Sequence, residues 1–362
     1  MYDLSDARYA RQVVLRGFGS AAQERLANGR VLIVGAGGLG SPAASYLAAA
    51  GVGTMALVDT DVVDVSNLHR QLLYTTPDVG RRKLEVARER LQAINPQVVV
   101  HTHDLRFTAE NGRALVAGYD VVIDATDNFP TRYAINDACL THGIPFVYGS
   151  VARFEGQVSV FAAPGGPCYR CLFPVMPEPG TVPTCAEDGV LGVVPGMIGL
   201  HQATEVIKLL TAIGTPLVGQ LMLIDLLAQD SQRITVAQRA DCPSCGASRS
   251  LSLAAMSIQQ LPPAEVAALL TGDDAPTIID VREPWEYDLV HVPASTLIPL
   301  STLAARASSL DPSRSYALLC HHGMRSEMAA NWLMQHGFTR LINIDGGIDA
   351  WSMDVDPSLP RY

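Results

Sequence analysis

The stretch Val31-Leu-Ile-Val-Gly35-Ala36-Gly37-Gly38-Leu39-Gly40 decides the fold of the N-terminal part of this chain. Four apolar residues predict a buried strand, and the small residues from 41 to 50 predict a helix directly after the glycines. Such a turn lets the backbone approach a phosphate, whose charge is favoured at the helix N-terminus. We therefore predict a nucleotide site at Gly35, Gly37, Gly38 and Gly40, although a tight turn without a ligand could use the same glycines.

Strand and helix patterns continue to alternate around this stretch, which predicts a mostly parallel sheet with helices on both faces. Further strands are expected at 55–59, 98–102, 121–124 and 146–150, and an amphipathic helix at 81–94. Residues 247–257 are small and polar. A second α/β pattern begins at Ile258, with strands at 277–281, 316–319 and 341–343 and helices at 301–307 and 325–335. We predict a first domain at 1–248, a linker at 249–257 and a smaller α/β domain at 258–362.

Composition restricts the class of protein. The 362 residues are 48% hydrophobic and 17% charged, as in soluble globular proteins, and the net charge of −10 argues against nucleic acid as the main partner. Residues 31–58 carry no charge, but their six glycines and Pro42 fit an α/β core better than a membrane span. The acidic N-terminus lacks the apolar core of a signal peptide, so we expect a cytoplasmic protein without membrane contact.

Charged residues after the glycine loop indicate the type of nucleotide chemistry. Asp59 ends the second strand, where a carboxylate can bind ribose hydroxyls, and a dinucleotide oxidoreductase would share this feature. Cleavage of ATP between its α- and β-phosphates needs more positive charge than hydride transfer does. Arg70 and Lys83 could supply that charge, and Asp127, after the fourth strand, could hold Mg²⁺.

Two Cys-x-x-Cys pairs, Cys168/Cys171 and Cys242/Cys245, offer four thiolates in short loops. Two such pairs can close a tetrahedral zinc site that has no open position, which is typical of a structural site. Disulfides or free thiols are the alternatives, and a reducing compartment favours the metal.

A further cysteine lies in the second domain, in Cys320-His-His-Gly-Met-Arg325-Ser326. This loop is placed between an expected strand and an expected helix, where backbone N–H groups and the helix N-terminus stabilise a thiolate. Arg325 adds positive charge. A half-buried cysteine without chemistry is the alternative interpretation.

Residues 5–248 resemble the MoeB/ThiF family of sulfur-carrier adenylyltransferases, relatives of the ubiquitin-activating enzymes. The matching pieces are Arg8-Tyr-Ala-Arg11-Gln12, the glycine loop, Asp59-Thr-Asp61, Asn67-Leu-His-Arg70-Gln71, Lys83, Thr126-Asp127-Asn128 and both cysteine pairs. The resemblance implies a homodimer, in which Arg11 reaches the ATP of the other subunit. It implies ATP contacts by the four glycines, Asp59, Asp61, Ser66, Asn67, Leu68, His69, Arg70, Lys83, Asp127 and Asn128.

Residues 258–360 resemble a rhodanese, through Ile279-Asp-Val-Arg-Glu283, Trp285-Glu-Tyr287, His291-Val-Pro293, the Cys320 loop and Asn343-Ile-Asp-Gly-Gly347. Where that family commonly has glycines around the His-x-Pro element, this chain has Val290 and Ala294. The resemblance implies that Cys320 carries a persulfide. The resemblance of residues 5–248 to the adenylyltransferases implies a chemical role for Cys185, as in some relatives with a cysteine there, whereas Cys139 is expected in the core.

Together these resemblances imply adenylation of the C-terminal glycine of a small ubiquitin-like sulfur carrier with a Gly-Gly tail. The Cys320 persulfide would then give a carrier thiocarboxylate, with Cys185 as a releasing thiol. The sulfur would come from a persulfide donor such as a cysteine desulfurase or from thiosulfate. A nicotinamide-dependent oxidoreductase and a scaffold with vestigial sites are the rivals. The destination pathway, whether molybdopterin, thiamine or another, stays open.

Overall fold

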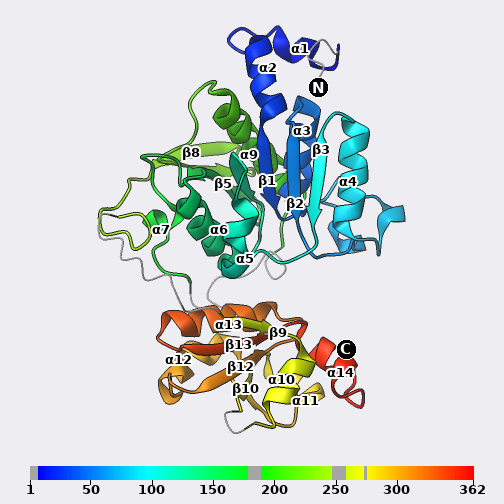
Figure 1. Cartoon of the computed structure of the whole chain (residues 1–362), viewed down its shortest axis with the longest axis vertical. Coiled ribbons are helices and arrows are strands. Elements are labelled where there is room, and N and C mark those ends of the chain that lie inside the picture. Colours follow the sequence, from blue (N-terminus) through cyan, green and yellow to red (C-terminus); the bar gives the residue numbers. More distant parts are fainter. Residues whose placement is uncertain (1–6, 178–188, 247–257, 273–274) are drawn as a thin grey trace. The chain divides into compact units, whose positions relative to one another are not determined.

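The structure is a computed structural model that describes residues 7–177, 189–246, 258–272 and 275–362. The chain divides into two compact units, Met1–Val175 with Thr184–Ser250 and Met176–Pro183 with Leu251–Tyr362. Each unit contains its own sheet with helices packed on it (Figure 1). The expected linker, residues 249–257, lies outside the described residues.

In the described part of the first unit, eight strands form one sheet in the order β3-β2-β1-β4-β5-β6-β7-β8. Neighbours are parallel from β3 to β5 and antiparallel from β5 to β8. The strands are β1 (Arg30–Val34), β2 (Thr54–Val58), β3 (Val99–His103), β4 (Val121–Asp124), β5 (Phe146–Ala152), β6 (Glu155–Phe161), β7 (Gln220–Asp225) and β8 (Asp230–Thr235). The predicted mostly parallel sheet is confirmed, whereas β6, β7 and β8 were not foreseen.

The helices of this unit cover both faces of its sheet (Figure 1). They are α1 (Ala10–Val13), α2 (Gly19–Asn28), α3 (Gly40–Ala50), α4 (Lys83–Ile94), α5 (Ala109–Val116), α6 (Phe129–His142), α7 (Tyr169–Leu172) and α9 (Val193–Thr211). Short 3₁₀ turns occur at η1 (Ala7–Tyr9), η2 (Val65–Asn67) and η3 (Thr76–Asp78). Helix α3 ends where Gly51 adopts φ +89°, a left-handed cap that glycine adopts without strain.

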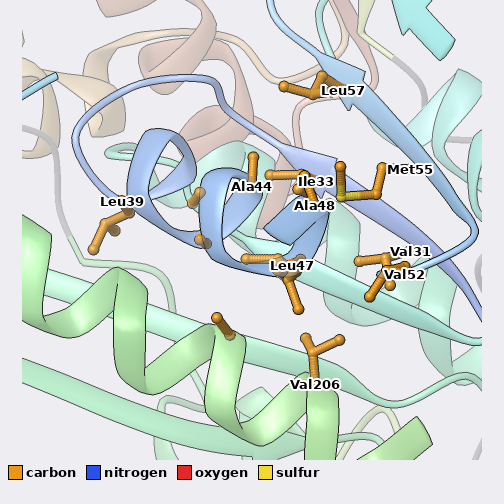
Figure 2. Packing of buried hydrophobic residues seen from close by; sticks show 14 of the residues in the cluster. Val31, Ile33, Leu39, Ala44, Leu47, Ala48, Val52, Met55, Leu57 and Val206 are labelled. Atoms are coloured by element: carbon orange, nitrogen blue, oxygen red, sulfur yellow. The ribbon is translucent and has the colours of Figure 1, made fainter. Parts of the chain in front are cut away.

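The core of the first unit fixes the glycine loop in place. Alternate residues of β1, Val31 and Ile33, point to the face that α3 covers with Leu47 and Ala48, and Val206 of α9 adds to the same cluster (Figure 2). Because these side chains are fully or almost fully buried, α3 cannot move relative to β1 without opening the core. The helix N-terminus is therefore held at the carboxyl end of the strand.

The second unit contains a five-stranded parallel sheet in the order β11-β10-β12-β13-β9, as far as its residues are described. The strands are β9 (Gln259–Leu261), β10 (Thr277–Asp280), β11 (Ser295–Leu297), β12 (Ser315–Leu319) and β13 (Arg340–Ile344). The helices are α10 (Pro263–Leu269), α11 (Pro284–Leu289), α12 (Leu303–Arg306), α13 (Met324–Gln335) and α14 (Gly347–Asp354), with 3₁₀ turns η4 (Leu300–Thr302) and η5 (Ala307–Ser309). The smaller α/β fold predicted for this region is confirmed.

The uncharged segment 31–58 forms β1, α3 and β2 of the first unit. None of the helices in the described part of the chain combines the length and the apolar character needed to cross a membrane.

Candidate functional site

The glycine loop lies between the carboxyl ends of β2 and β4, the strands that flank β1. The N–H of Gly35 donates to the Val58 carbonyl at 2.9 Å. Gly35 has φ +98°, and a Cβ there would lie 2.6 Å from the Ala125 carbonyl oxygen. A Cβ on Gly40 would lie 1.9 Å from the Gly35 carbonyl oxygen. The first and last glycines are therefore required by the turn itself.

The middle glycines face side chains that come from elsewhere in the unit. A Cβ on Gly37 would lie 3.6 Å from Gln71 Nε2, and one on Gly38 would lie 3.6 Å from Arg70 Cγ and 3.1 Å from Pro195 of α9. Gln71 is only 4% exposed, and its Oε1 has no hydrogen-bond partner among the described residues. A buried acceptor without a donor costs free energy, so this atom fits a donor from a bound nucleotide.

Asp59, Asp61 and Lys83 form a charged group beside the loop. Asp59 accepts the N–H of Ala36 at 2.7 Å and that of Asp61 at 2.8 Å, which fixes its carboxylate. Burial, followed by the neighbouring charge of Asp61, raises the pKa of Asp59. The Lys83 side chain is 4% exposed and donates to Asp61, which is 64% exposed, at 2.7 Å. Because an exposed carboxylate is well solvated, it compensates this buried cation only weakly.

The segment that contains Arg70 folds as η2 and a turn. Asp64 starts it by accepting the Ser66 N–H at 2.7 Å, and Arg70 donates to the Ser66 carbonyl at 2.8 Å and contacts His69 at 2.8 Å. The Asn67 carbonyl accepts the Arg70 N–H at 3.1 Å. Leu68 is partly buried against the core. This turn brings Arg70, the last of the predicted residues 66–70, next to Gly38.

Asp127 and Asn128 follow β4 at the same edge of the sheet. Asp127 is exposed, as a residue that binds a metal with its substrate would be. Asn128 is the N-cap of α6, because its Oδ1 accepts the Thr131 N–H at 3.0 Å. The side chain predicted to contact the nucleotide therefore starts a helix in this structure.

A buried ion pair beneath this edge escaped the sequence analysis. Arg132 of α6 donates to Asp124 at 3.1 Å, and the two side chains are 6% and 0% exposed. The guanidinium also lies 5.0 Å from the centre of the Tyr148 ring, and Gln202 donates to the Asp124 carbonyl at 2.6 Å. The pair joins β4, β5, α6 and α9 under the site. A charged residue ending an apolar strand was its only local signal.

Arg11 is distant from the glycine loop of its own unit. It is exposed on α1, and its neighbour Gln12 donates to the Ala50 carbonyl at the last residue of α3 at 3.1 Å. The loop meets α3 at the other end, Gly40, and an eleven-residue helix is about 16 Å long. Figure 1 shows α1 at the end of the sheet from which β1 starts. The structure does not bring Arg11 to the other predicted nucleotide ligands.

The four predicted metal ligands converge. The Sγ atoms of Cys168, Cys171, Cys242 and Cys245 all lie within 4.8 Å of one another. The Sγ–Sγ separations are 4.0 Å for Cys168–Cys171, 3.5 Å for Cys168–Cys242 and 3.3 Å for Cys171–Cys245. A tetrahedral zinc with Zn–S bonds of about 2.3 Å places sulfurs about 3.8 Å apart. The thiols fit zinc, and they offer no open position for chemistry.

Helix α6 supports these cysteine loops from outside. Asn136 accepts the Tyr169 N–H at 2.8 Å, and Asp137 pairs with Arg170 at 2.9 Å. Asp137 also accepts from Ser244 at 3.4 Å, so one carboxylate contacts both cysteine loops. Because α6 starts at the nucleotide edge, it connects the metal centre to that site mechanically.

The sequence prediction for Cys139 can be compared with the structure, whereas that for Cys185 cannot. Cys139 is fully buried on α6, as expected for a core residue, and burial raises the pKa of its thiol. Cys185 lies outside the described residues.

In the second unit, Cys320 directly follows β12, and its loop leads into α13. The Gly323 N–H donates to Cys320 Sγ at 3.1 Å, and the Ser326 hydroxyl lies 3.4 Å from the same sulfur. Gly323 has φ +92°, which lets the loop turn its N–H inward. Cys320 is 1% exposed. The loop therefore directs two hydrogen-bond donors, the Gly323 N–H and the Ser326 hydroxyl, at one sulfur atom.

Helix α14 holds the opposite side of this loop. The Ile348 N–H donates to the Cys320 carbonyl at 2.8 Å, and the Asp349 N–H donates to the His321 carbonyl at 3.2 Å. A Cβ on Gly347 would lie 2.4 Å from both of these carbonyl oxygens. The loop carbonyls are thus bound by a helix N-terminus and face away from the sulfur.

Arg325 is engaged by a carboxylate. Its two Nη atoms each donate to Glu286 at 2.6 Å, in a bidentate pair. Burial acts to raise the pKa of Glu286, but the bonds from Arg325 and the Glu283 N–H outweigh it and lower that pKa to about 2. The positive charge that Arg325 was expected to add is therefore largely neutralised, and the residue ties α13 to α11.

Comparisons with known proteins match the two parts of the chain to two different families. The model of the ThiF family matches residues 9–245, and that of the rhodanese-like domain matches residues 262–354. The chain is 41% identical to a probable adenylyltransferase/sulfurtransferase MoeZ of Mycobacterium tuberculosis, over 98% of this chain and 95% of the relative. It is 35% identical to adenylyltransferase and sulfurtransferase MOCS3 of Arabidopsis thaliana, over 98% and 85%. A sulfur carrier protein adenylyltransferase of Thermus thermophilus is 52% identical over 66% of this chain and 90% of its own length.

Among solved structures, E. coli MccB with MccA-N7isoASN superposes with a TM-score of 0.61, at 23% identity over 67% of this chain and 75% of that chain. E. coli MccB with ATP gives 0.58, at 22% identity over 68% and 76%. At these identities the likeness shows a shared fold.

Proposed function

The chain belongs to the ThiF family and carries a rhodanese-like domain, and on this premise we propose that it adenylates a small ubiquitin-like sulfur carrier and loads it with sulfur. The observation that carries the proposal is the presence of two complementary sites in one chain. One is a glycine loop that has beside it the buried cation Lys83 and the Gln71 Oε1, which has no partner among the described residues. The other is a loop of donors around the Cys320 sulfur.

In the first step, a carboxylate oxygen of the carrier's terminal glycine attacks the α-phosphorus of ATP, and pyrophosphate leaves. The attacking carboxylate is already ionised at neutral pH, so no side chain has to remove a proton. Lys83 and Arg70 compensate the growing negative charge, and Asp59 binds the ribose hydroxyls. Asp127 would hold Mg²⁺, which supplies further charge compensation for the phosphates. Catalysis rests on positioning and charge.

In the second step, the outer sulfur of a Cys320 persulfide attacks the acyl carbon, and AMP leaves. The product is an acyl disulfide between the carrier and Cys320. The Cys185 thiolate then attacks the Cys320 sulfur, which releases the carrier thiocarboxylate and leaves a Cys185–Cys320 disulfide. Two equivalents of an external thiol reduce that disulfide and leave as their own disulfide, and a sulfane donor such as a cysteine desulfurase or thiosulfate restores the persulfide.

The proposal includes a homodimer, zinc and a cytoplasmic location. Arg11 lies at the far end of α3 from its own glycine loop, which supports a role at the site of a second subunit. The spacing of the four thiols supports structural zinc. The reliance on reduced thiols supports the cytoplasm.

The test is ATP–pyrophosphate exchange with and without a carrier that ends in Gly-Gly, followed by mass spectrometry of the carrier after addition of thiosulfate. We expect exchange only with the intact tail, and replacement of one carboxylate oxygen by sulfur. Absence of carrier-dependent exchange contradicts the proposal and favours a scaffold. Nicotinamide reduction in its place would indicate an oxidoreductase.

A further inference from the structure

Tyr362 lies against the Cys320 loop, although it is 42 positions from Cys320 in the sequence. Its ring stacks on His321, with centroids 4.4 Å apart and planes 10° apart. Its hydroxyl accepts a hydrogen bond from Arg282 at 2.8 Å and donates one to Glu286 Oε1 at 3.0 Å. No motif of the sequence analysis included this residue.

Contacts outside the loop fix the segment that carries Tyr362. Arg361 pairs with Asp349 of α14 at 2.7 Å, and the Tyr362 ring meets Trp285 edge-on at 6.3 Å. Tyr362 is still 38% exposed. It is held from two sides and does not fill a core position.

The two groups bound by the hydroxyl belong to the framework of the Cys320 loop. Glu286 binds both Nη atoms of Arg325, the sixth residue of that loop. Arg282 is fully buried and pairs with Asp280 at 2.6 Å, at the end of β10, the strand beside β12. The Tyr362 hydroxyl therefore joins two charged pairs that support the loop from different elements.

The Tyr362 ring contacts the beginning of the Cys320 loop, whereas Glu286 binds Arg325 near its end. His321 directly follows Cys320 and is stacked between Tyr362 and His322, whose ring centroid is 4.0 Å away at 16°. A stack of three rings restricts the rotation of the 320–322 segment. The same segment leads into the Gly323 N–H that donates to Cys320 Sγ.

We propose that Tyr362 is a positioning residue of sulfur transfer, which holds the Cys320 loop through its ring and through the bonds of its hydroxyl to Arg282 and Glu286, so that the Gly323 N–H stays directed at the Cys320 sulfur. The role deepens the proposed function, on which it rests for the identity of the reaction. Tyr362 acts through the loop and does not itself react.

The experiment compares Tyr362→Phe, which keeps the ring and loses both hydrogen bonds, with Tyr362→Leu, which loses both features. Tyr287→Phe is the matched control, because its hydroxyl donates to the Ser295 carbonyl in the same unit. Each full-length variant is assayed for thiosulfate:cyanide sulfur transfer, for the pH dependence of Cys320 alkylation by iodoacetamide, and for thermal unfolding. Cys320→Ala identifies the alkylated site.

For Tyr362→Phe we expect kcat to fall roughly tenfold, the size of a lost hydrogen bond to a charged group, with the KM for thiosulfate unchanged. The alkylation midpoint should move to higher pH, because a less fixed loop stabilises the thiolate less. Tyr362→Leu should show the larger change in both. Tyr287→Phe should match the wild type.

Wild-type kcat and alkylation midpoint in both Tyr362 variants would overturn the proposal. An equal loss in Tyr287→Phe, or a lower unfolding temperature with an unchanged alkylation profile, would also overturn it by indicating a purely structural role. If the wild type transferred no sulfur through Cys320, the proposed function of this unit would fail. The alkylation midpoint would still decide the role of Tyr362.

Discussion

The glycine loop and the Cys320 loop have the same local architecture but are built for ligands of different size. Each follows a parallel strand and ends in a helix, α3 in one unit and α13 in the other. In the first loop, the middle glycines face side chains of a separate turn, and Gln71 Oε1 has no partner in the described structure. In the second, the Gly323 N–H is already directed to Cys320 Sγ. The first loop therefore faces an acceptor from another segment, whereas the second surrounds a sulfur of its own.

The cations around the two loops differ in the same way. Lys83 is buried but compensated by the exposed Asp61, so its charge is available to a polyphosphate. Arg282 and Arg325 of the second unit are instead paired with Asp280 and Glu286, whose side chains are 0% and 5% exposed. A site for several phosphates would need a cation that its own carboxylates compensate only weakly. A site for one sulfur anion relies on backbone N–H groups and uses arginines as supports.

The largest expected effect separates the two sites completely. Cys320→Ala should abolish thiosulfate:cyanide sulfur transfer, because it removes the sulfur that carries the persulfide in the proposed function, while carrier-dependent ATP–pyrophosphate exchange stays at the wild-type rate. Both assays are run on the same preparation. Loss of exchange in this variant would show that the sites are not chemically separate.

Lys83→Ala should give the reciprocal result. Removal of one buried charge that stabilises the transition state costs about 10²–10³ in rate, so exchange should fall by that factor. Sulfur transfer by Cys320 should not change. Lys208→Ala, which removes a lysine whose Nζ donates to the Thr215 carbonyl on the same unit, is the control. Equal losses in both lysine variants would contradict the role of Lys83.

Glycine substitutions test whether each loop is held as the structure indicates. Gly40→Ala and Gly347→Ala both place a Cβ against backbone, and overpacking of this kind costs roughly 1–3 kcal/mol in the free energy of unfolding. Gly40→Ala should impair only exchange, and Gly347→Ala only sulfur transfer. Gly196→Ala on α9, where a Cβ meets nothing within 4 Å, is the control. Denaturant unfolding and the two assays distinguish the cases.

Metal removal should affect stability before chemistry. Cys245→Ser removes one of four thiolates, so we expect loss of bound zinc and a lower unfolding temperature for the first unit. Sulfur transfer by the second unit should persist. Zinc content is measured by mass spectrometry, with Cys139→Ala as a control that keeps the metal. A zinc-free wild-type protein of unchanged stability would refute the structural role.

The smallest effect concerns pH. The folded pKa of Glu286 is lowered from 4.5 to about 2, so its ionisation stabilises the second unit above pH 4.5. This contribution should disappear as the pH falls from 4.5 to about 2. The difference in unfolding free energy between wild type and Glu286→Gln should shrink over that window. For Asp59 the folded pKa is raised, so its contribution to the unfolding free energy has the opposite sign. As the pH rises, Asp59 ionises at a lower pH in the unfolded chain than in the folded chain, and stability falls. A difference independent of pH would contradict the assignment.

Residues adjacent in the sequence were the ones that could be predicted. The glycine loop, the paired cysteines and the Cys320 loop are contiguous patterns whose spacing follows from local geometry. Most parallel strands were also evident, since apolar runs alternate with helical patterns, whereas the three-residue strands β9 and β11 were not predicted. Strand β8 was not, because all six of its residues are exposed and show no alternation between an apolar and a polar face.

The sequence by itself therefore determined the fold class, the family and the positions of the cysteines and glycines of the candidate sites. The tertiary structure alone decided that Gln71 is buried beside Gly37 with no described partner for its Oε1, and that Arg132 pairs with Asp124. It also decided that Arg325 is neutralised by Glu286 and that Tyr362 joins the same network. These contacts link residues from different elements, so they depend on how strands and helices pack, which local patterns do not specify.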